Sequence, residues 1–498
     1  MTHAAHPPGA DKRPHRITAQ ALVQVADCRR RLWLGAHSRV PMAPLPEHVV
    51  VLRERAREHE RTVAARFADL AGPFWKHEGP LSEVAAETLR LLRETRRPIW
   101  RGALLSADGH RVAHPGFLSW DGDTLVVTEA RLALRPEARA DFALQLAHVR
   151  SLLEESGVTA PVRFEIVNGQ GQTLDVEPAT AARYASVARA VEATLAEPVE
   201  PDELRAHSNC KRCPYYEHCW DQAERDRRIE LLPEVQIAHV PEYHAAGVRT
   251  LADLVALDPA RLPEGPVRQA AKKAVVVASA WLEKRAAWLQ PPLLSDGPLV
   301  WFDLEGDSLG EQAENPIYLW GLALERPGEA PVAEAIVAEM GPAGDAAAWE
   351  RFVARASEIL EREQGARFVH WDAFEPLWIE RYAARLGAPE GFVARMKTAC
   401  FDLKRVLDRC VRLPLRSYSI KHVAPWMGFE WRNPESGSEW SVAQFHRARE
   451  TADPAERERL VAALVEYNED DLWAMRAVWR WLRTNAPAPG AGSPPERR

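Results

Sequence analysis

Two carboxylates one residue apart end an apolar run in the second half of the chain. The run begins near Val300 and leads into Asp303 and Glu305. If residues 299–305 form a strand, both acids point to the same face, because side chains alternate along a strand. Adjacent like charges repel, and a divalent cation between them relieves the repulsion; carboxylate oxygens are ligands that Mg²⁺ and Mn²⁺ prefer. An isolated pair of this kind is also typical of a solvated strand end, so the interpretation depends on other residues.

Two later stretches carry polar side chains that suit such a metal site. A second apolar run begins at Phe368 and ends in polar residues that include Glu375. Near the C-terminus, Tyr467 and Asp471 stand four residues apart in a helical pattern over residues 454–482. Residues with this spacing share one helix face.

This order of motifs resembles the DEDD exonucleases of the RNase H-like fold. The motifs are D-x-E on a strand, an apolar run ending in Phe-acid, and Tyr-x-x-x-Asp on a late helix. The resemblance implies four carboxylates that hold two metal ions, one activating the attacking water and the other stabilising the leaving oxygen. By position, the ligands would be Asp303, Glu305, Glu375 and Asp471, and Tyr467 would orient the water.

The chain departs from the family pattern at two positions. Glu375 stands where the family usually has Asp, and His370 stands where many members have Asn. A longer acid can still coordinate a cation while shifting its position slightly, and Asp372 is the alternative ligand. Asp402 is expected near the metals without binding them directly, and Lys421 either meets a phosphate or is simply exposed.

Length and composition set the frame for these motifs. A chain of 498 residues is long enough for two or three domains. Its 46% hydrophobic and 27% charged content is that of a soluble globular protein. No apolar run approaches the ~20 residues that cross a bilayer, and residues 1–16 lack a signal-peptide core, so we expect a cytoplasmic protein. The net charge of −7 neither indicates nor excludes a nucleic-acid partner.

Four of the six cysteines form a pattern of one remote residue and one close group. Cys28 stands alone, whereas Cys210, Cys213 and Cys219 form C-x2-C-x5-C. In a cytosolic protein such a group more often binds metal than forms disulfides. Four thiolates suit Zn²⁺, for which His218 could compete as a ligand.

The same spacing resembles the iron–sulfur clasp of RecB-like nucleases, including the CRISPR adaptation nucleases. The resemblance implies a [4Fe–4S] cluster that ties together the two ends of a nuclease domain. Cys28 and Cys219 bracket a segment of domain size, which favours iron–sulfur over the alternative of Zn²⁺.

The bracketed segment resembles a PD-(D/E)XK nuclease at several positions. Strands are expected over 114–120 and 124–133, joined by a turn at 121–123. By resemblance, Glu129 is the acid of the D/E-x-K motif and Gln145 is the glutamine of the following helix. His59, in a helical stretch over 49–70, corresponds to the upstream histidine of the RecB-like group.

Two substitutions affect this N-terminal site. Gly116 stands at the position of a metal-binding acid, and Arg131 stands at the position of the catalytic lysine. Glycine cannot bind a cation through a side chain, and arginine keeps its charge but does not readily release a proton. We therefore expect a catalytically degenerate domain that serves as a structural or DNA-binding platform. If the strand containing Gly116 is misplaced, Asp121 or Asp123 would supply the missing acid.

A helical connector is expected between the two α/β domains. Residues 237–254 predict a helix, a turn containing glycine, and a second helix capped by Thr250. This pattern resembles a helix-hairpin-helix module, in which packing and DNA contact are equally plausible roles. The expected organisation is a disordered tail at 1–16, a RecB-like domain at 17–228, the connector at 229–295, an RNase H-like domain at 296–485 and a disordered tail at 486–498.

Taken together, the modules resemble one bacterial and archaeal family of RecB-like nucleases with a cysteine cluster and a C-terminal RNase H-like exonuclease domain. The resemblance implies a metal-dependent nuclease of DNA processing, repair or defence. The expected activity is 3′→5′ exonuclease action on single-stranded nucleic acid, DNA rather than RNA, with a helicase or another DNA-processing protein as a candidate partner. Two alternatives stay open: a dual nuclease with an active N-terminal site, and a non-catalytic nucleic-acid-binding scaffold subunit.

Overall fold

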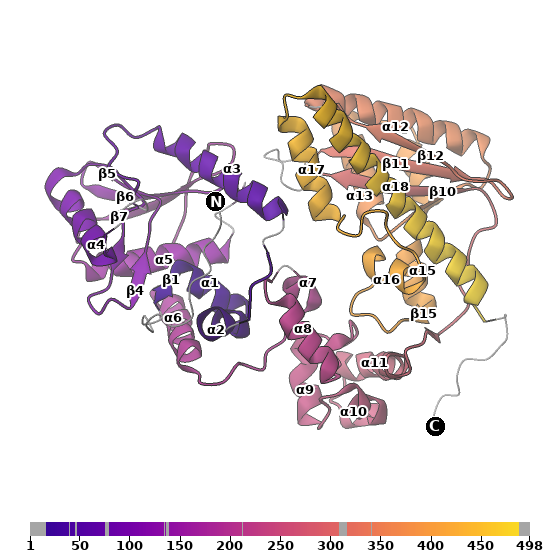
Figure 1. Ribbon diagram of the computed structural model, residues 1–498, viewed down its shortest axis with the longest axis horizontal. Helices are drawn as coiled ribbons and strands as arrows, with labels where there is room; N and C mark the ends of the chain where they lie inside the picture. Colours follow the sequence, from indigo (N-terminus) through magenta and orange to yellow (C-terminus); the bar gives the residue numbers. More distant parts are fainter. Residues whose placement is uncertain are drawn as a thin grey trace.

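The protein has a mixed α/β fold in three parts, which Figure 1 shows as an N-terminal α/β part, a helical connector and a C-terminal α/β part. The computed structural model describes residues 16–38, 40–44, 47–74, 79–133, 135, 139–211, 213–307, 316–339 and 341–487. Most of the two tails expected at 1–16 and 486–498 lies outside the described residues.

A five-stranded sheet forms the centre of the N-terminal part. Its strand order is β2-β5-β6-β7-β8, in which β6 and β7 run parallel and the other neighbours antiparallel. The strands are β2 (Ile99–Trp100), β5 (Phe117–Asp121), β6 (Thr124–Ala130), β7 (Val162–Val167) and β8 (Thr173–Asp175). The two strands predicted over 114–120 and 124–133 correspond to β5 and β6, and Gly122 supplies the positive φ of 58° in the turn between them.

Helices cover both faces of this sheet. α5 (Ala140–Glu155) packs Leu146, Val149 and Leu152 against one face. α3 (Glu47–Ala64) packs Val63 against the other, and it ends before the predicted limit of 49–70. The remaining elements of this part are β1 (Ile17–Thr18), α1 (Ala19–Asp27), α2 (Arg29–His37), α4 (Leu81–Arg90), a π-helical turn (Leu91–Thr95), β3 (Leu104–Leu105), β4 (Arg111–Ala113) and α6 (Ala181–Ala196).

The connector is helical, as the sequence predicts. Thr250 caps the second helix of the predicted pair through a capping box with Asp253, and Gly247 has a φ of 82° in the turn. Its helices are α7 (His207–Cys210), α8 (Tyr216–Arg225), α9 (Val240–Ala245), α10 (Leu251–Ala256) and α11 (Pro266–Glu283), with 3₁₀ turns at Ile229–Leu231, Ile237–His239 and Pro259–Arg261. Trp220 of α8 belongs to the same apolar core as these helices, so α8 is packed as part of the connector.

The C-terminal sheet has the order β12-β11-β10-β13-β14. β10 runs antiparallel to β11 and parallel to β13, and β13 runs parallel to β14. The strands are β10 (Leu299–Gly306), β11 (Ile317–Glu325), β12 (Val332–Val337), β13 (Arg367–His370) and β14 (Cys400–Asp402).

Side chains of β10 alternate between two apolar cores. Phe302 joins the core beneath α12 (Pro342–Arg362), and Trp301 joins the core beneath α18 (Pro454–Asn485). Because the period of a strand is two residues, Asp303 and Glu305 fall on the α18 face.

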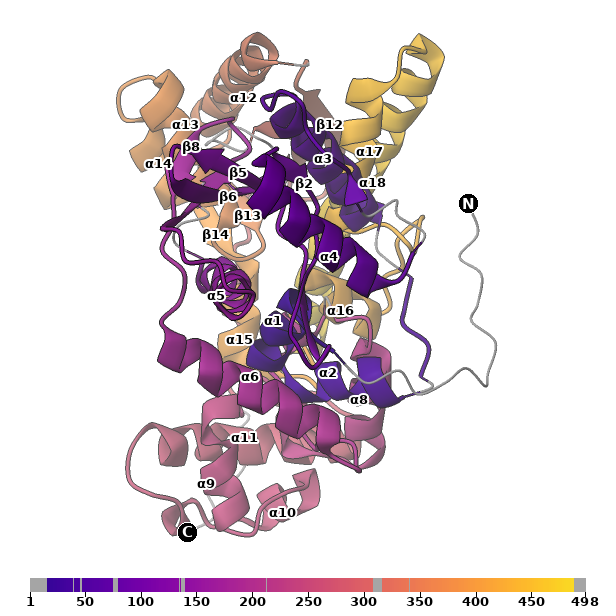
Figure 2. The same ribbon diagram turned by 90° about the vertical axis from the view of Figure 1, so that its left-hand side faces the viewer.

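The remaining helices surround this sheet. α18 crosses β10 and β11 (Figure 1), and α17 of this part contacts α3 of the N-terminal part, beside which it lies in Figure 2. The helices around this sheet, besides α12 and α18, are α13 (Phe374–Leu386), α14 (Phe392–Ala399), α15 (Leu403–Cys410), α16 (Ile420–Trp426) and α17 (Ser438–Glu450).

A short strand from the connector side completes the C-terminal part. β9 (Ala287–Trp288) pairs antiparallel with β15 (Val411–Arg412). The ring of Trp288 stacks on that of Trp481 in α18, with the centroids 5.5 Å apart.

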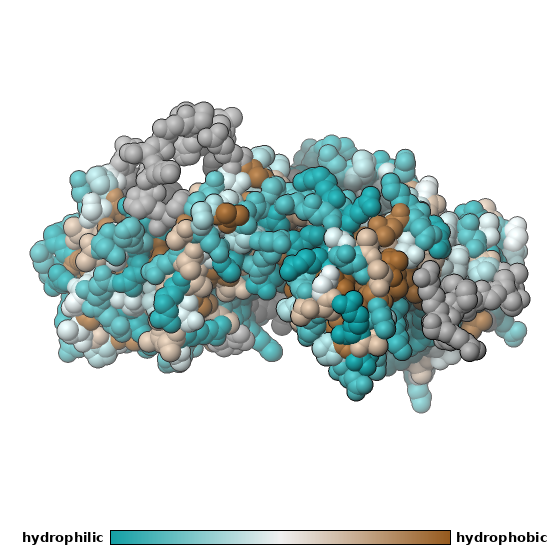
Figure 3. Space-filling view, turned by 90° about the horizontal axis from the view of Figure 1, so that it is seen from below, coloured by the Kyte–Doolittle hydropathy of each residue, from teal (hydrophilic) through white to brown (hydrophobic). Residues whose placement is uncertain are grey.

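The surface seen from below is mostly hydrophilic, with hydrophobic residues in small groups (Figure 3). Within the described parts of the chain, every helix is too short or too polar to pass through a lipid bilayer.

Candidate metal centre

The structure brings Asp303, Glu305 and Asp471 together. One carboxylate oxygen from each lies within 4.8 Å of the other two. β10 presents Asp303 and Glu305 on one face, and α18 crosses that face and brings Asp471 over them. Glu305 and Asp471 are buried and Asp303 is half-buried.

This arrangement is electrostatically unfavourable without a cation. Burial, followed by the charge of Asp471, raises the pKa of Asp303 well above its usual range. The same two causes raise the pKa of Glu305 to about 8. Burial also raises the pKa of Asp471, although Lys421 opposes the shift. Buried carboxylates that repel one another fit a divalent cation, which supplies the missing positive charge.

Polar and aromatic partners surround Asp471. Lys421 on α16 donates to its Oδ1 at 2.8 Å, and the indole N–H of Trp431 donates to the same oxygen at 2.7 Å. The Lys421 ammonium also lies 4.3 Å from the centroid of the Tyr467 ring. Tyr467 is buried, and burial and the charge of Asp471 raise the pKa of its hydroxyl. Lys421 is therefore part of the acidic site, whereas the sequence left open whether it is simply exposed.

Asn468 positions Asp303 in a way that sequence analysis missed. Its amide Nδ2 donates to Asp303 Oδ2 at 2.7 Å, and its side chain is buried. Gly321 lies directly opposite Asp303 in the β10–β11 register. A Cβ on Gly321 would lie only 1.7 Å from Asn468 Oδ1, so the glycine provides the space that the amide occupies. Two features of the sequence could have indicated this contact: the asparagine next to Tyr467, and the glycine inside the apolar strand, which can mark a close approach of another group.

Three other polar contacts were also missed. Tyr318 OH lies 3.4 Å from Glu305 Oε2 and 2.7 Å from Ser441 Oγ. His446 Nε2 lies 2.8 Å from Asp307 Oδ1, and both side chains are almost fully buried. These contacts join the β10 segment to α17, which is remote from it in the sequence, and no local pattern predicts them.

Glu375 lies beside the three acids without joining the group within 4.8 Å. It is buried in the first turn of α13, and its charge contributes to the raised pKa of Asp303. Its Oε2 is 3.4 Å from His370 Nδ1. Burial acts to lower the pKa of His370, but contacts with Cys400 and Glu375 outweigh it and raise the value to about 10.

The two other expected neighbours have structural partners. Asp372 is exposed, has a φ of 73° and lies 3.5 Å from the ammonium of Lys404. Asp402 caps α15 by accepting the backbone N–H of Arg405 at 2.9 Å. Glu375 is therefore better placed than Asp372 to act with the three clustered acids.

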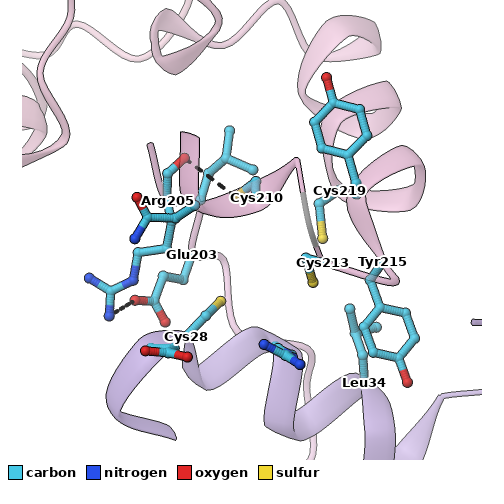
Figure 4. Close-up of a pocket in the computed structure, with 13 residues that line it drawn as sticks. Cys28, Leu34, Glu203, Arg205, Cys210, Cys213, Tyr215 and Cys219 are labelled. Atoms are coloured by element: carbon cyan, nitrogen blue, oxygen red, sulfur yellow. Dashed lines mark hydrogen bonds and ion pairs between the residues drawn. The ribbon is translucent and has the colours of Figure 1, made fainter. Parts of the chain in front are cut away.

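The four cysteines of the sequence pattern line one pocket, as Figure 4 shows. Cys28 comes from the junction of α1 and α2, Cys210 ends α7, Cys213 follows it, and Cys219 lies on α8. The side chains surround a common space of about 140 Å³. His218 is turned to Glu200, at 3.2 Å, and does not line the pocket.

The spacing of the sulfur atoms bears on the metal. Among the described residues, only the acidic trio places three possible ligand atoms within 4.8 Å of one another, so no three of these sulfurs do. Tetrahedral Zn²⁺ with Zn–S bonds of about 2.3 Å would require sulfurs roughly 3.8 Å apart. Burial also raises the pKa of the Cys219 thiol to about 12. The three-sulfur spacing found here is thus wider than that of a tetrahedral zinc site.

Three of the expected N-terminal site residues lie together. Glu129 is buried and accepts the backbone N–H of Gly116 at 2.8 Å. Arg131 pairs with the other oxygen of Glu129 at 3.0 Å and donates to Gln145 at 3.1 Å. They line a cavity of about 550 Å³ with Arg101. The guanidinium of Arg131 thus neutralises the buried carboxylate of Glu129.

Neither alternative acid reaches this N-terminal site. A Cβ on Gly116 would lie 2.8 Å from the carbonyl oxygen of Thr128, so a longer side chain would require a shift. Asp121 is five residues further along β5, about 16 Å in an extended strand, and pairs with Arg163.

The two remaining expected residues are also turned away. Asp123 pairs with Arg96 at the β5–β6 turn. His59 contacts the carbonyl oxygen of Val167 at 3.0 Å and does not line the cavity. Asp121 and Asp123 therefore both lie outside the lining of the cavity that Glu129 borders.

Comparison with known families identifies the class of the C-terminal part. Residues 300–483 match the family model RNase_H_2, described as RNase_H superfamily. The match spans the sheet, α18 and all three clustered acids, and the C-terminal part is an RNase H-like domain. It supports a nuclease that uses divalent metal ions and acts on nucleic acid. No curated protein matches the chain.

Proposed function

We propose that the protein is a 3′→5′ exonuclease of the DEDD type that degrades single-stranded DNA in cytoplasmic DNA processing, repair or defence. The observation that carries the proposal is the buried group of Asp303, Glu305 and Asp471 with Tyr467 beside it. Three carboxylates packed together are unfavourable for folding alone, and they suit a site that holds cations during phosphodiester hydrolysis.

The residues of this chain have distinct roles in the proposed reaction. Asp303, Glu305 and Asp471 would hold Mg²⁺ or Mn²⁺ with Glu375 as the outer ligand, and the bound ions would activate water and stabilise the leaving oxygen. Tyr467, four residues from Asp471 on the same helix face, orients the attacking water through its hydroxyl. Lys421 holds Asp471 in place and offers its ammonium to a substrate phosphate.

The test is hydrolysis of end-labelled DNA and RNA strands with Mg²⁺ or Mn²⁺. We expect a ladder that shortens from the 3′ end on single-stranded DNA, and its loss in Asp303→Ala and Asp471→Ala. The folded state should be retained, because removing one of several repelling acids rarely costs stability. Glu350→Ala, an exposed acid on α12, is the matched control. Full activity in either acid variant, shortening from the 5′ end, or a preference for RNA would contradict the proposal.

We also propose that the four cysteines hold a [4Fe–4S] cluster. The support is their convergence on one pocket with widely spaced sulfurs. Anaerobically purified protein should be brown, absorb at about 400 nm as iron–sulfur thiolates do, and lose this absorbance on Cys213→Ser. Cys410→Ser, a buried thiol outside the pocket, is the control. Colourless protein with stoichiometric zinc would contradict this assignment.

For the N-terminal part we propose a RecB-like PD-(D/E)XK domain without cleavage activity, which serves as a DNA-binding platform. The pairing of Glu129 with Arg131 supports it, because this carboxylate already has a cationic partner. The sheet order with one parallel pair flanked by helices is compatible with such a domain.

A further inference from the structure

A second cavity opens next to the acidic group, at the same edge of the C-terminal sheet. β10, β13 and β14 run parallel; β13 and β14 end at His370 and Asp402, and Asp303 follows the part of β10 that pairs with β13. The cavity has a volume of about 460 Å³ and is bordered by His370. His370 also lies 3.4 Å from Glu375, whose charge acts on Asp303, so His370 borders both the cavity and the acid beside the clustered trio. Ligands of open α/β sheets bind outside the carboxyl ends of parallel strands.

Two arginines form the charged wall of this cavity. Arg405 and Arg409 stand four residues apart on the exposed face of α15, whose other face buries Leu403 and Leu407. Among the described residues, neither guanidinium forms an ion pair, in contrast with Lys404 on the same helix, which pairs with Asp408 at 3.1 Å. A pair of guanidinium groups with this spacing suits phosphate oxygens.

Among the described residues, the acids of the cavity form no ion pair with these arginines. Asp402 accepts the backbone N–H of Arg405 as the cap of α15. Asp372 accepts the N–H of Ala373 at 2.9 Å and lies beside Lys404. Both carboxylates therefore have other partners, and within the part of the chain that the structure describes the two guanidinium groups remain available to an anionic ligand.

Apolar groups form the rest of the lining. Phe401, Pro376 and Val406 border the cavity together with Ala373. A cavity of this volume lies within the range of about 300–1,000 Å³ that is usual for sites of small organic ligands. An apolar lining together with two cations fits a ligand with a flat apolar part and a phosphate, which describes a nucleotide.

We propose that this cavity binds one nucleotide of the substrate strand, adjacent to the nucleotide that is cleaved at the acidic site. Arg405 and Arg409 contact its phosphate, and Phe401 and Pro376 contact its base. The proposal rests on the proposed nuclease function. In this proposal the two arginines bind a neighbouring nucleotide of a strand. A substrate that consists of a single nucleotide therefore does not contact them.

The test compares an oligodeoxythymidine of about ten nucleotides, within usual single-strand site sizes, with the p-nitrophenyl ester of thymidine 5′-monophosphate. For Arg405→Ala/Arg409→Ala, the ratio of kcat/KM for the oligonucleotide to that for the ester should fall about tenfold, as expected from lost charge-assisted contacts. The slope of log affinity against log salt, measured by fluorescence anisotropy with Ca²⁺, should become shallower by about 0.7 per lost phosphate contact. The control is Arg351→Ala/Arg395→Ala, which removes two exposed arginines from α12 and α14.

The outcomes separate this proposal from the nuclease assignment. If the wild-type protein cleaves neither substrate with Mg²⁺ or Mn²⁺, the nuclease function is wrong. If it cleaves both and the ratio and salt slope of the arginine variant equal those of the control, the nucleotide site is wrong. An equal loss on both substrates also contradicts the proposal, because the arginines would then act on the acidic site or on the fold.

Discussion

The contact between Gly321 and Asn468 leads to a sharp prediction about the acidic site. In Gly321→Ala, the new methyl group would lie 1.7 Å from Asn468 Oδ1, far inside any permitted contact. The Asn468 side chain must move, which breaks its 2.7 Å hydrogen bond to Asp303. Inserting a methyl group into such a packed position costs about 1–3 kcal/mol of stability. Losing the partner that orients an acid proposed to bind metal should cost roughly 10–100-fold in metal affinity or activity.

Two measurements check these magnitudes. Thermal unfolding should show Gly321→Ala to be destabilised, and titration of nuclease activity with Mn²⁺ should show a higher half-saturating concentration. Asn468→Ala should give the same metal defect without the steric cost. Gly437→Ala is the control, since Gly437 has an extended φ of −164° and a Cβ at this position would meet no described atom within 4 Å.

The double variant Gly321→Ala/Asn468→Ala tests the physical cause. Shortening residue 468 removes the atom that the new methyl group meets, so the double variant should be more stable than Gly321→Ala alone. Its metal response should equal that of Asn468→Ala, because the hydrogen bond to Asp303 is lost only once. Strict addition of the two stability losses, or a wild-type metal response in Gly321→Ala, would refute the reasoning.

Three further predictions concern charge. In the folded metal-free protein, the pKa of Glu305 rises from its usual 4.5 to about 8. The folded state therefore binds one more proton than the unfolded state between these values, and the stability of the protein should fall as the pH rises through this window. Calorimetry should show that Mn²⁺ stabilises the protein more at pH 8 than at pH 5. Glu129→Ala should leave the nuclease activity nearly intact, and Arg131→Ala should weaken DNA binding modestly and mainly at low salt. If Asp303→Ala still cleaves DNA and this cleavage disappears on adding Glu129→Ala, the N-terminal site is active. Arg416→Ala should lower the midpoint of thermal unfolding, because this mostly buried guanidinium of the C-terminal part donates to Glu224 of α8 at 2.6 Å. An unchanged midpoint would mean that the contact contributes nothing to stability.

Local periodicity was enough to predict the parts of the site that lie within single elements. The alternation of β10 placed Asp303 and Glu305 on one face, and the four-residue spacing on α18 placed Tyr467 beside Asp471. The cysteine spacing likewise predicted one shared pocket. These patterns depend only on the geometry of one strand, one helix or one turn.

The contacts between elements could not be read in this way. Asn468 reaches Asp303 across 165 positions of the chain, and Trp431 reaches Asp471 across 40. Both contacts depend on how α18 crosses the sheet, which is set by packing of the core and leaves no periodic mark in the sequence. The same holds for Arg131, whose bond to Gln145 requires α5 to lie against the end of β6.

The pairing of β9 with β15 has a consequence for how such a protein could be assembled from parts. Trp288 sits ahead of the expected boundary at residue 296, yet it stacks on Trp481, and the N–H of Leu289 donates to the carbonyl of Cys410 at 2.8 Å. A gene fusion that transferred residues 296–485 alone would leave β15 without its partner strand β9, and the indole of Trp481 without the stacked ring of Trp288. The smallest segment that recombination could move intact between proteins therefore begins near Ala287, inside what the sequence marks as connector.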